Sequence, residues 1–398
     1  MPRTTVWPAE DGIRGTQRRG TRGTRTAGAR LWRVSGVLAA GAAAALALPA
    51  GTGLASAHPG TTLQFVRIDQ VSDNPRLTPT ADPNVINPWG VSEFPHGPLW
   101  VSNEGHANTT LYSGADSTSA KLNPVGLVVS IPGGRPTGQA FNTTSTGPTP
   151  GFAVTDGKNT ASARFLFATL NGVIAGWEPT VGATMAGVPS STAEQGTKVP
   201  GAVFTGLAQA GNRLYAADVA HRTVDVFGPD FKQLMMPGAF QDRLIPRRFS
   251  PFNVAAVNGQ IVVTYSSPHA SLGGGFVDVF TPDGVLVKRL IRSGLLNQPW
   301  GVAMAPSSWG QFAGDLLVGN HGNGLINAFD PATGRYAGTI RVAGGRPFVA
   351  PGLWGLIFGD GPAAPGGPPS AGFPSTLFFT VGATFGRHGV IGEITPVT

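Results

Sequence analysis

Cysteine is absent from the 398-residue chain, which excludes disulfide scaffolds, thiolate zinc sites, iron–sulfur clusters and cysteine nucleophiles. Charge is scarce, because Asp, Glu, Lys and Arg together make up only 12% of the residues. After residue 58 there is also no amphipathic stretch of useful length with a 3.6-residue period, which argues against a helical fold. The hydrophobic content of 41% is nevertheless enough to build a core, so the composition indicates a folded rather than a disordered chain.

The formal net charge of +7 comes almost entirely from the N-terminus, where residues 1–57 contain eight Arg and only two acidic residues. An Ala-rich apolar stretch, Val34 to Leu48, and the small residues Ala55-Ser56-Ala57 follow, which is the order of a secretory signal. The apolar stretch is about fifteen residues, shorter than the roughly 20 that span a bilayer. The sequence therefore predicts an export segment, residues 1–57, cleaved near Ala57, and a secreted single domain, residues 58–398, without a membrane anchor.

The remainder of the chain consists of short apolar, β-branched and aromatic runs bounded by Gly, Pro, Asn and Asp, which predicts an all-β fold. One pattern recurs: a turn with Pro or Gly, an aromatic residue, a strand, a second strand ending in Asn, Asp or Gly, and a third strand. The copies begin at Pro88-Trp89-Gly90, Arg135-Pro136, Phe204-Thr205-Gly206, Ser250-Pro251-Phe252, Pro299-Trp300-Gly301 and Leu353-Trp354-Gly355.

Six such units are typical of a six-bladed β-propeller of four-stranded antiparallel blades. A propeller must close its ring, because an unpaired terminal blade exposes a sheet edge. The isolated alternating strand from Thr62 to Asp69 is therefore predicted to supply the outer strand of the last blade. The surplus length falls in three predicted loops, Thr143 to Ala163, Glu178 to Pro200 and Gly359 to Pro374. A β-sandwich pair or a β-solenoid is the alternative.

A set of short stretches carries a resemblance to known families: Asn87-Pro88-Trp89-Gly90, Ala216-Ala217-Asp218, Pro251-Phe252-Asn253, Asn297-Gln298-Pro299-Trp300-Gly301, Val318-Gly319-Asn320-His321-Gly322 and Gly352-Leu353-Trp354-Gly355. The repeat resembles the NHL and related six-bladed propellers. Over nearly all of residues 62–394 the chain resembles a bacterial family of exported, conserved hypothetical propeller proteins. The resemblance implies a fold and an exported location, but no reaction or ligand.

In such a blade, the start of the inner strand and the end of the second strand lie on one face, around the mouth of the central channel. Four aromatic residues occupy inner-strand starts: Trp89, Phe252, Trp300 and Trp354. Aromatic faces at a concave mouth could stack on a small molecule or an extracellular polymer such as a sugar chain. The alternative is that these rings pack between blades as core.

Polar residues at the same mouth suggest a cation site: Asn103, Glu104, Asp218, Asn253, Asn320 and His321. Calcium-dependent lactonases and related six-bladed hydrolases, which the chain resembles in fold, hold calcium with Asn, Asp and Glu oxygens there. Those enzymes place a key Asn between Pro and Gly, where this chain has Trp89 and Trp300. The alternative is that Asn and Asp satisfy turn backbones.

Four histidines follow second strands of different blades: His106, His221, His321 and His388. They could hold zinc or copper, or one could act as a general base, but no local ligand spacing distinguishes this from isolated loop histidines. Nucleophile-elbow, zincin and phosphate-loop motifs are absent from the sequence. The net charge after residue 57 is only about +1, so no nucleic-acid partner is predicted. The predicted function is a monomeric ligand-binding or interaction module. A metal-assisted hydrolase or lyase at the channel mouth is the alternative.

Overall fold

A computed structural model describes residues 63–114, 121–267, 274–292, 294–361 and 370–397. The predicted export segment, residues 1–57, lies outside these ranges, so its cleavage near Ala57 and the secretion of the chain stay predictions. Within the described part, no helix is long and apolar enough to cross a membrane.

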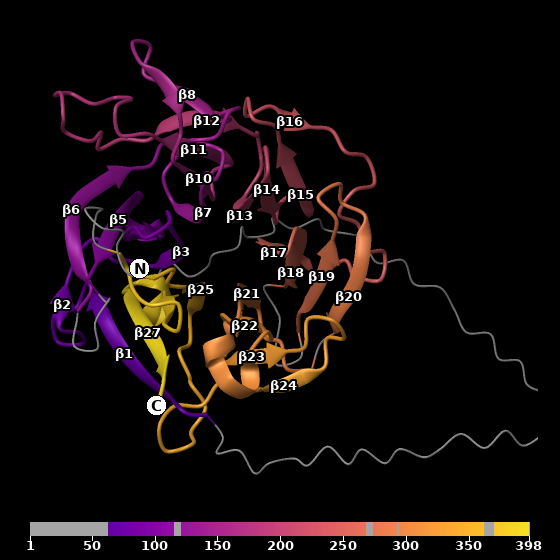
Figure 1. Cartoon of the computed structure of the whole chain (residues 1–398). Helices are drawn as coiled ribbons and strands as arrows, with labels where there is room; N and C mark the ends of the chain where they lie inside the picture. Colours follow the sequence, from indigo (N-terminus) through magenta and orange to yellow (C-terminus); the bar gives the residue numbers. More distant parts are fainter. Residues whose placement is uncertain (1–62, 115–120, 268–273, 293, 362–369, 398) are drawn as a thin grey trace, which may run out of the picture. The chain divides into compact units, whose positions relative to one another are not determined.

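The described residues form six four-stranded antiparallel blades, the architecture that the repeats predict (Figure 1). Blade 1 consists of β3 (Pro88–Glu93), β4 (Leu99–Asn103), β5 (Asn108–Ser113) and β6 (Asn123–Ser130). Blade 2 consists of β7 (Pro136–Phe141), β10 (Phe165–Thr169), β11 (Val173–Trp177) and β12 (Glu194–Lys198). Blade 3 consists of β13 (Phe204–Ala210), β14 (Arg213–Asp218), β15 (Thr223–Phe227) and β16 (Gln233–Leu234).

The second half of the ring repeats this order. Blade 4 consists of β17 (Ser250–Val257), β18 (Gln260–Ser266), β19 (Phe276–Phe280) and β20 (Leu286–Arg292). Blade 5 consists of β21 (Pro299–Met304), β22 (Leu316–Asn320), β23 (Ile326–Phe329) and β24 (Tyr336–Thr339). Blade 6 consists of β25 (Leu353–Phe358), β26 (Leu377–Val381), β27 (Val390–Pro396) and β1 (Phe65–Ser72).

Ring closure follows the prediction, because β1 pairs antiparallel with β27 from Phe65–Pro396 to Ser72–Val390. The N-terminal strand thus completes the blade that the C-terminal strands begin. The inner strands β3, β7, β13, β17, β21 and β25 contact one another in this order, and β25 contacts β3. The two-residue strand β2 (Thr80–Ala81) adds to the outer edge of β1 in parallel orientation.

Glycine follows the turn in five of the six inner strands because these strands approach one another too closely for a side chain. A Cβ on Gly138 would lie 2.1 Å from the backbone nitrogen of Leu207 on the next inner strand. A Cβ on Gly301 would lie 2.5 Å from the backbone oxygen of Trp354. The repeated Pro-x-Gly pattern thus has a packing cause at the ring axis.

Six buried apolar clusters form the core, one between each pair of neighbouring blades in the described residues. The cluster between blades 5 and 6, for example, joins Leu317 of β22 to Leu353 of β25 and also takes in Phe65 of β1. No single blade buries its own apolar face, so the ring is stable only as a whole.

Blade 2 carries the largest additions to the common plan. The segment from Thr143 to Ala163, predicted as a loop, instead contains a hairpin of β8 (Ala153–Thr155) and β9 (Thr160–Ser162). Asp156 stabilises the hairpin turn, because its Oδ1 accepts the backbone N–H groups of Lys158 and Asn159. The predicted loop from Glu178 to Pro200 contains the fourth strand, β12. The short helical elements of the described ranges are η1 (Glu104–His106), η2 (Ser307–Phe312) and α1 (Ala383–Gly386).

Candidate functional site

The four aromatic residues predicted to bind ligand, Trp89, Phe252, Trp300 and Trp354, gather at the ring axis and are at most 4% exposed. Trp354 stacks on Trp89 with 3.6 Å between ring centroids. It also meets Trp300 edge-on at 5.8 Å and Phe252 at 5.8 Å. The ring faces therefore contact one another, as the core interpretation expects, and their role in ligand binding stays a prediction.

His321 belongs to this aromatic cluster. Its imidazole stacks on Trp354 with 3.8 Å between centroids, and burial lowers the pKa of His321 to about 4. Its Nδ1 has no hydrogen-bond partner among the described residues. At neutral pH the ring is therefore uncharged and packs as an aromatic face.

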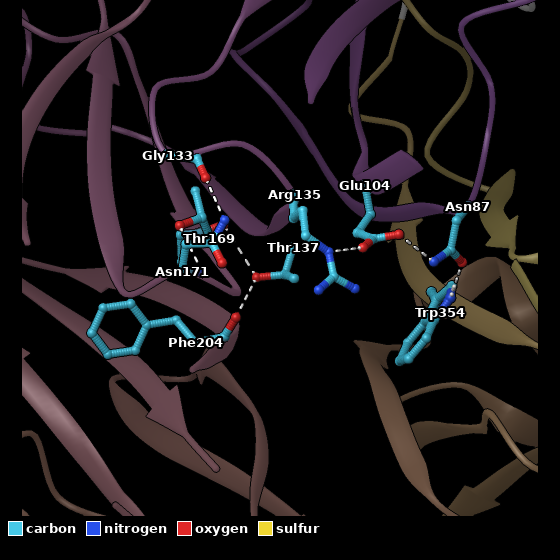
Figure 2. Close-up of polar contacts among 10 residues, drawn as sticks. Asn87, Glu104, Gly133, Arg135, Thr137, Thr169, Asn171, Phe204 and Trp354 are labelled. Carbon is cyan, nitrogen blue, oxygen red and sulfur yellow. Dashed lines mark hydrogen bonds and ion pairs between the residues drawn. The ribbon is translucent and has the colours of Figure 1, made fainter. Parts of the chain in front are cut away.

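Polar contacts beside the cluster join blades 6, 1 and 2 through Asn87, Glu104 and Arg135, and a separate contact joins blades 2 and 3 (Figure 2). Glu104 accepts Arg135 Nε at 2.6 Å through Oε1 and Asn87 Nδ2 at 2.7 Å through Oε2. Asn87 Oδ1 in turn accepts the indole N–H of Trp354 at 3.2 Å. In blade 2, the hydroxyl of Thr137 donates to the backbone oxygen of Phe204 at 2.8 Å. Both oxygens of the one carboxylate in this network are thus already occupied by protein donors.

Three residues of the mouth hold a left-handed backbone immediately before proline: Asn87, Arg135 and Gln298, with φ of 48°, 52° and 52°. A residue before proline is normally driven to extended conformations, and a non-glycine residue with positive φ is costly. The three equivalent turns therefore store strain where the inner strands begin.

The six predicted metal ligands have separate partners in their own surroundings. Asn103 donates to Asn108 and Thr110, Asn253 donates to the backbone oxygen of Trp300, and Asn320 pairs with the backbone of Asn297 and Leu295. Glu104 and His321 have the partners described above, and Asp218 contacts His221. Their joint role as a calcium site stays a prediction.

The four predicted histidines also have different surroundings. His321 packs on Trp354, His221 Nδ1 lies 2.6 Å from Asp218 Oδ2, and His388 Nδ1 lies 2.6 Å from Asp73 Oδ2. His106 is exposed at the end of η1. Zinc or copper binding by this set stays a prediction.

Asp225 is a residue that sequence reasoning missed. It lies on β15 and joins Asp218 and His221 in a group whose ligand atoms are all within 4.8 Å of one another. Burial and the nearby Asp218 raise the pKa of Asp225 to about 6. A carboxylate in the middle of the buried run Val224-Asp225-Val226 is the sequence signal that could have identified it.

A cavity of about 210 Å³ lies among the inner strands and is lined by residues of all six, including Gln139, Asn253 and Trp300. Trp89 and Trp354 are not part of its lining.

A larger pocket of about 610 Å³ lies between blades 1 and 2. Its lining is rich in aromatic side chains: Phe94, Trp100, Phe141, Phe165 and Trp177. Trp100 stacks on Phe165 with 4.0 Å between centroids and contacts Trp177 at 4.8 Å. We call this cavity the blade 1–2 pocket.

The insertions of blade 2 form part of the rim of the blade 1–2 pocket. Ser145 and Thr146 come from the segment that leads to the β8–β9 hairpin, and Val188 and Pro189 come from the loop before β12. A neighbouring hollow of about 400 Å³ shares Val188 and Pro189. The pocket is thus an addition to the repeated blade plan.

Two polar groups of this apolar lining lack partners. The indole N–H of Trp100, which is 1% exposed, and the buried hydroxyl of Ser145 have no hydrogen-bond partner among the residues described. Arg164 also lines the pocket, and its guanidinium lies 3.9 Å from Glu178. The lining therefore contains two buried hydrogen-bonding groups that the protein does not satisfy.

Glu93, which precedes the pocket residue Phe94, is half-buried, and its Oε2 is buried without a hydrogen-bond partner among the described residues. Burial, with a smaller contribution from the charge of Asp360, raises the pKa of Glu93 from 4.5 to about 8. Between these two values the folded chain retains a proton that the unfolded chain has lost. Stability should therefore fall as the pH rises through this window.

We expect Glu93→Gln to remove most of this pH dependence. Relative to the wild type, the variant should gain stability between pH 5 and pH 8 by up to about 4 kcal/mol, at about 1.4 kcal/mol per pKa unit. Urea unfolding followed by circular dichroism at several pH values measures the difference. Parallel profiles for the two proteins would show that Glu93 ionises normally.

Comparison of the sequence with known proteins finds no matching family model. Uncharacterized protein R648 of Acanthamoeba polyphaga mimivirus is 32% identical over 338 residues, which cover 81% of this chain and 78% of that protein. The chain belongs to the same family. Uncharacterized protein L690 of the same virus is 31% identical over 301 residues, covering 72% of this chain and 76% of the viral protein. These relatives are viral, so the expected bacterial and exported family stays a prediction.

Comparison of the fold finds a structural genomics protein of unknown function from Bacteroides thetaiotaomicron. Its crystal structure matches with a TM-score of 0.50 and 11% identity, covering 84% of this chain and 77% of the other. A streptogramin B lyase structure matches with a TM-score of 0.46 and 10% identity, over 84% of this chain and 98% of that chain. Similarity at this level concerns the fold and not the activity.

Proposed function

We propose that this propeller is a ligand-binding module that takes a small, flat, largely apolar molecule into the blade 1–2 pocket. The observation that supports the proposal is an aromatic cavity of about 610 Å³ whose lining contains unpaired donors. Pockets for small molecules usually measure about 300–1,000 Å³ and combine apolar walls with a few polar groups.

The lining also suggests the chemistry of the ligand. Its five aromatic side chains favour a planar ring system, which gains both buried apolar area and ring–ring contacts. Trp100 donates through its N–H and Arg164 carries a positive charge. An aromatic molecule with a carboxylate, sulfonate or carbonyl oxygen would satisfy both groups.

This site differs from the channel-mouth face that the sequence favours for ligand binding. At the mouth the aromatic faces cover one another, and the carboxylate of Glu104 is occupied by Arg135 and Asn87. At the blade 1–2 pocket the indole N–H of Trp100 and the hydroxyl of Ser145 have no protein partner in the described residues, whereas Arg164 lies 3.9 Å from Glu178. The pocket is therefore the stronger candidate.

The proposal can be tested with anilinonaphthalene sulfonate, a fluorescent aromatic anion of the expected chemistry. We expect saturable binding with one probe per chain, and loss of binding in Thr146→Trp, which places an indole at the pocket rim. Trp100→Phe keeps the ring but removes the N–H, so it should weaken binding by about three- to tenfold, the value of one hydrogen bond.

Val287→Trp is the matched control, because it adds an indole at an exposed position of β20 in blade 4. It should bind the probe as the wild type does. Equal binding by Thr146→Trp and the wild type, with both proteins folded, would refute the blade 1–2 pocket as the binding site.

A further inference from the structure

The hairpin between β14 and β15 in blade 3 brings two carboxylates and an imidazole together. Asp218 is the last residue of β14 and lies opposite Thr223 in the antiparallel register. Asp225 follows Thr223 by two residues, so its side chain is on the same face of the sheet and diagonal to Asp218. His221 lies in the intervening turn. The pairing register, rather than chance proximity of loops, thus places the three side chains together.

The backbone holds Asp218 in one orientation. Its Oδ1 accepts three backbone N–H groups, from Val203 at 3.1 Å, Ala220 at 2.9 Å and His221 at 3.1 Å. This arrangement directs the other oxygen, Oδ2, to Nδ1 of His221 at 2.6 Å. The Asp218 side chain is completely buried, so the carboxylate can move little and its Oδ2 stays directed toward His221.

Asp225 provides an independent indication of a ligand. The residue is 5% exposed, and its Oδ2 is buried without a hydrogen-bond partner in the described part of the chain. A buried carboxylate oxygen next to a second carboxylate is costly unless a cation or a donor neutralises it. The Asp218–His221 contact leaves this oxygen unsatisfied.

We propose that Asp218, His221 and Asp225 bind a divalent transition-metal ion such as Zn²⁺ or Mn²⁺. One imidazole nitrogen and two carboxylate oxygens are a ligand set of these ions, whereas calcium prefers oxygen alone. Ligand atoms around such an ion lie roughly 3–3.5 Å apart, so the three atoms, which lie within 4.8 Å of one another, need only small side-chain movements.

The His221 side chain is the adjustable member of the site. It is 47% exposed, whereas the Asp218 side chain is fully buried. His221 Nδ1 lies 2.6 Å from Asp218 Oδ2, so Nδ1 faces the carboxylates and is the coordinating atom.

The test is calorimetric titration of the full chain, first treated with a chelator and dialysed, with ZnCl₂ and separately with MnCl₂. We expect one ion per wild-type chain, and at least about tenfold weaker binding for Asp225→Asn, which keeps the shape of the ligand but removes its charge. Asp230→Asn is the matched control, because Asp230 is an exposed carboxylate of the same blade that pairs with Lys232. It should bind the metal as the wild type does.

His221→Gln provides a second variant in case Asp225→Asn does not fold, as judged by circular dichroism. It should also bind at least about tenfold more weakly. The absence of binding to the folded wild type at millimolar metal would overturn the site. Wild-type affinity in a folded Asp225→Asn or His221→Gln protein would overturn it too. Binding of CaCl₂ without binding of either transition metal would overturn the assigned class of ion.

Discussion

Trp354→Ala is expected to lower the free energy of unfolding by about 3–5 kcal/mol, the cost of deleting a large buried ring. The indole is 1% exposed and contacts Trp89, Trp300 and His321 at the ring axis. Its removal would also leave Asn87 Oδ1 without the N–H that it accepts. Urea unfolding monitored by circular dichroism measures this loss.

Two further variants separate the contributions. Trp354→Phe keeps an aromatic ring but removes the N–H, so the loss should be smaller, about 1–2 kcal/mol. Phe385→Ala changes an aromatic residue that is 97% exposed and should alter stability by less than about 0.5 kcal/mol. If Trp354→Ala were as stable as the wild type, Trp354 would not be part of the core. That result would favour the alternative that the aromatic residues at the channel mouth stack on a ligand.

The fold could be predicted from the sequence because its signals are local and repeated. Each inner strand begins with a similar turn, and the glycine of that turn is required by the close approach of the next inner strand, as at Gly138. The isolated strand at the N-terminus could be assigned to the last blade because a closed ring leaves no other edge to fill.

The arrangement at the ring axis could not be decided in the same way. The repeats place Trp89, Trp300 and Trp354 at equivalent positions, but whether three indoles line a mouth or fill it depends on the ring radius and on side-chain rotamers. Neither property is encoded in a short pattern. Both alternatives were therefore compatible with the sequence.

The blade 1–2 pocket and the side-chain group on the blade 3 hairpin, Asp218, His221 and Asp225, were missed for different reasons. The pocket joins residues distant in sequence, such as Val125 and Val188, through insertions that follow no repeat. The hairpin group depends on the register that sets Asp225 diagonal to Asp218, and a one-residue shift would send Asp225 to the other face. Register is a property of the folded sheet and could not be read from residue types alone.

Removal of residues 63–72 from the full chain is expected to cause the largest loss of folding stability, because it deletes β1 and opens the ring. β27 would lose its antiparallel partner, and two fully buried side chains, Phe65 and Val71, would leave the cores on both sides of blade 6. The loss should exceed about 5 kcal/mol, which is comparable to the whole stability of many domains. Circular dichroism and thermal melting should show a chain that no longer unfolds cooperatively.

Point substitutions in β1 test whether this loss comes from the inward side chains. Phe65 is fully buried against Trp309, with 4.4 Å between ring centroids, so Phe65→Ala should cost about 3–5 kcal/mol. Val66 and Ile68 alternate with the inward positions and are 40% and 39% exposed, so Val66→Thr and Ile68→Thr should each cost less than about 1 kcal/mol.

A truncated chain that melts within a few degrees of the wild type would contradict closure by β1. Because each apolar cluster lies between two blades, the loss of one outer strand should weaken both interfaces of blade 6 and, through them, the entire ring.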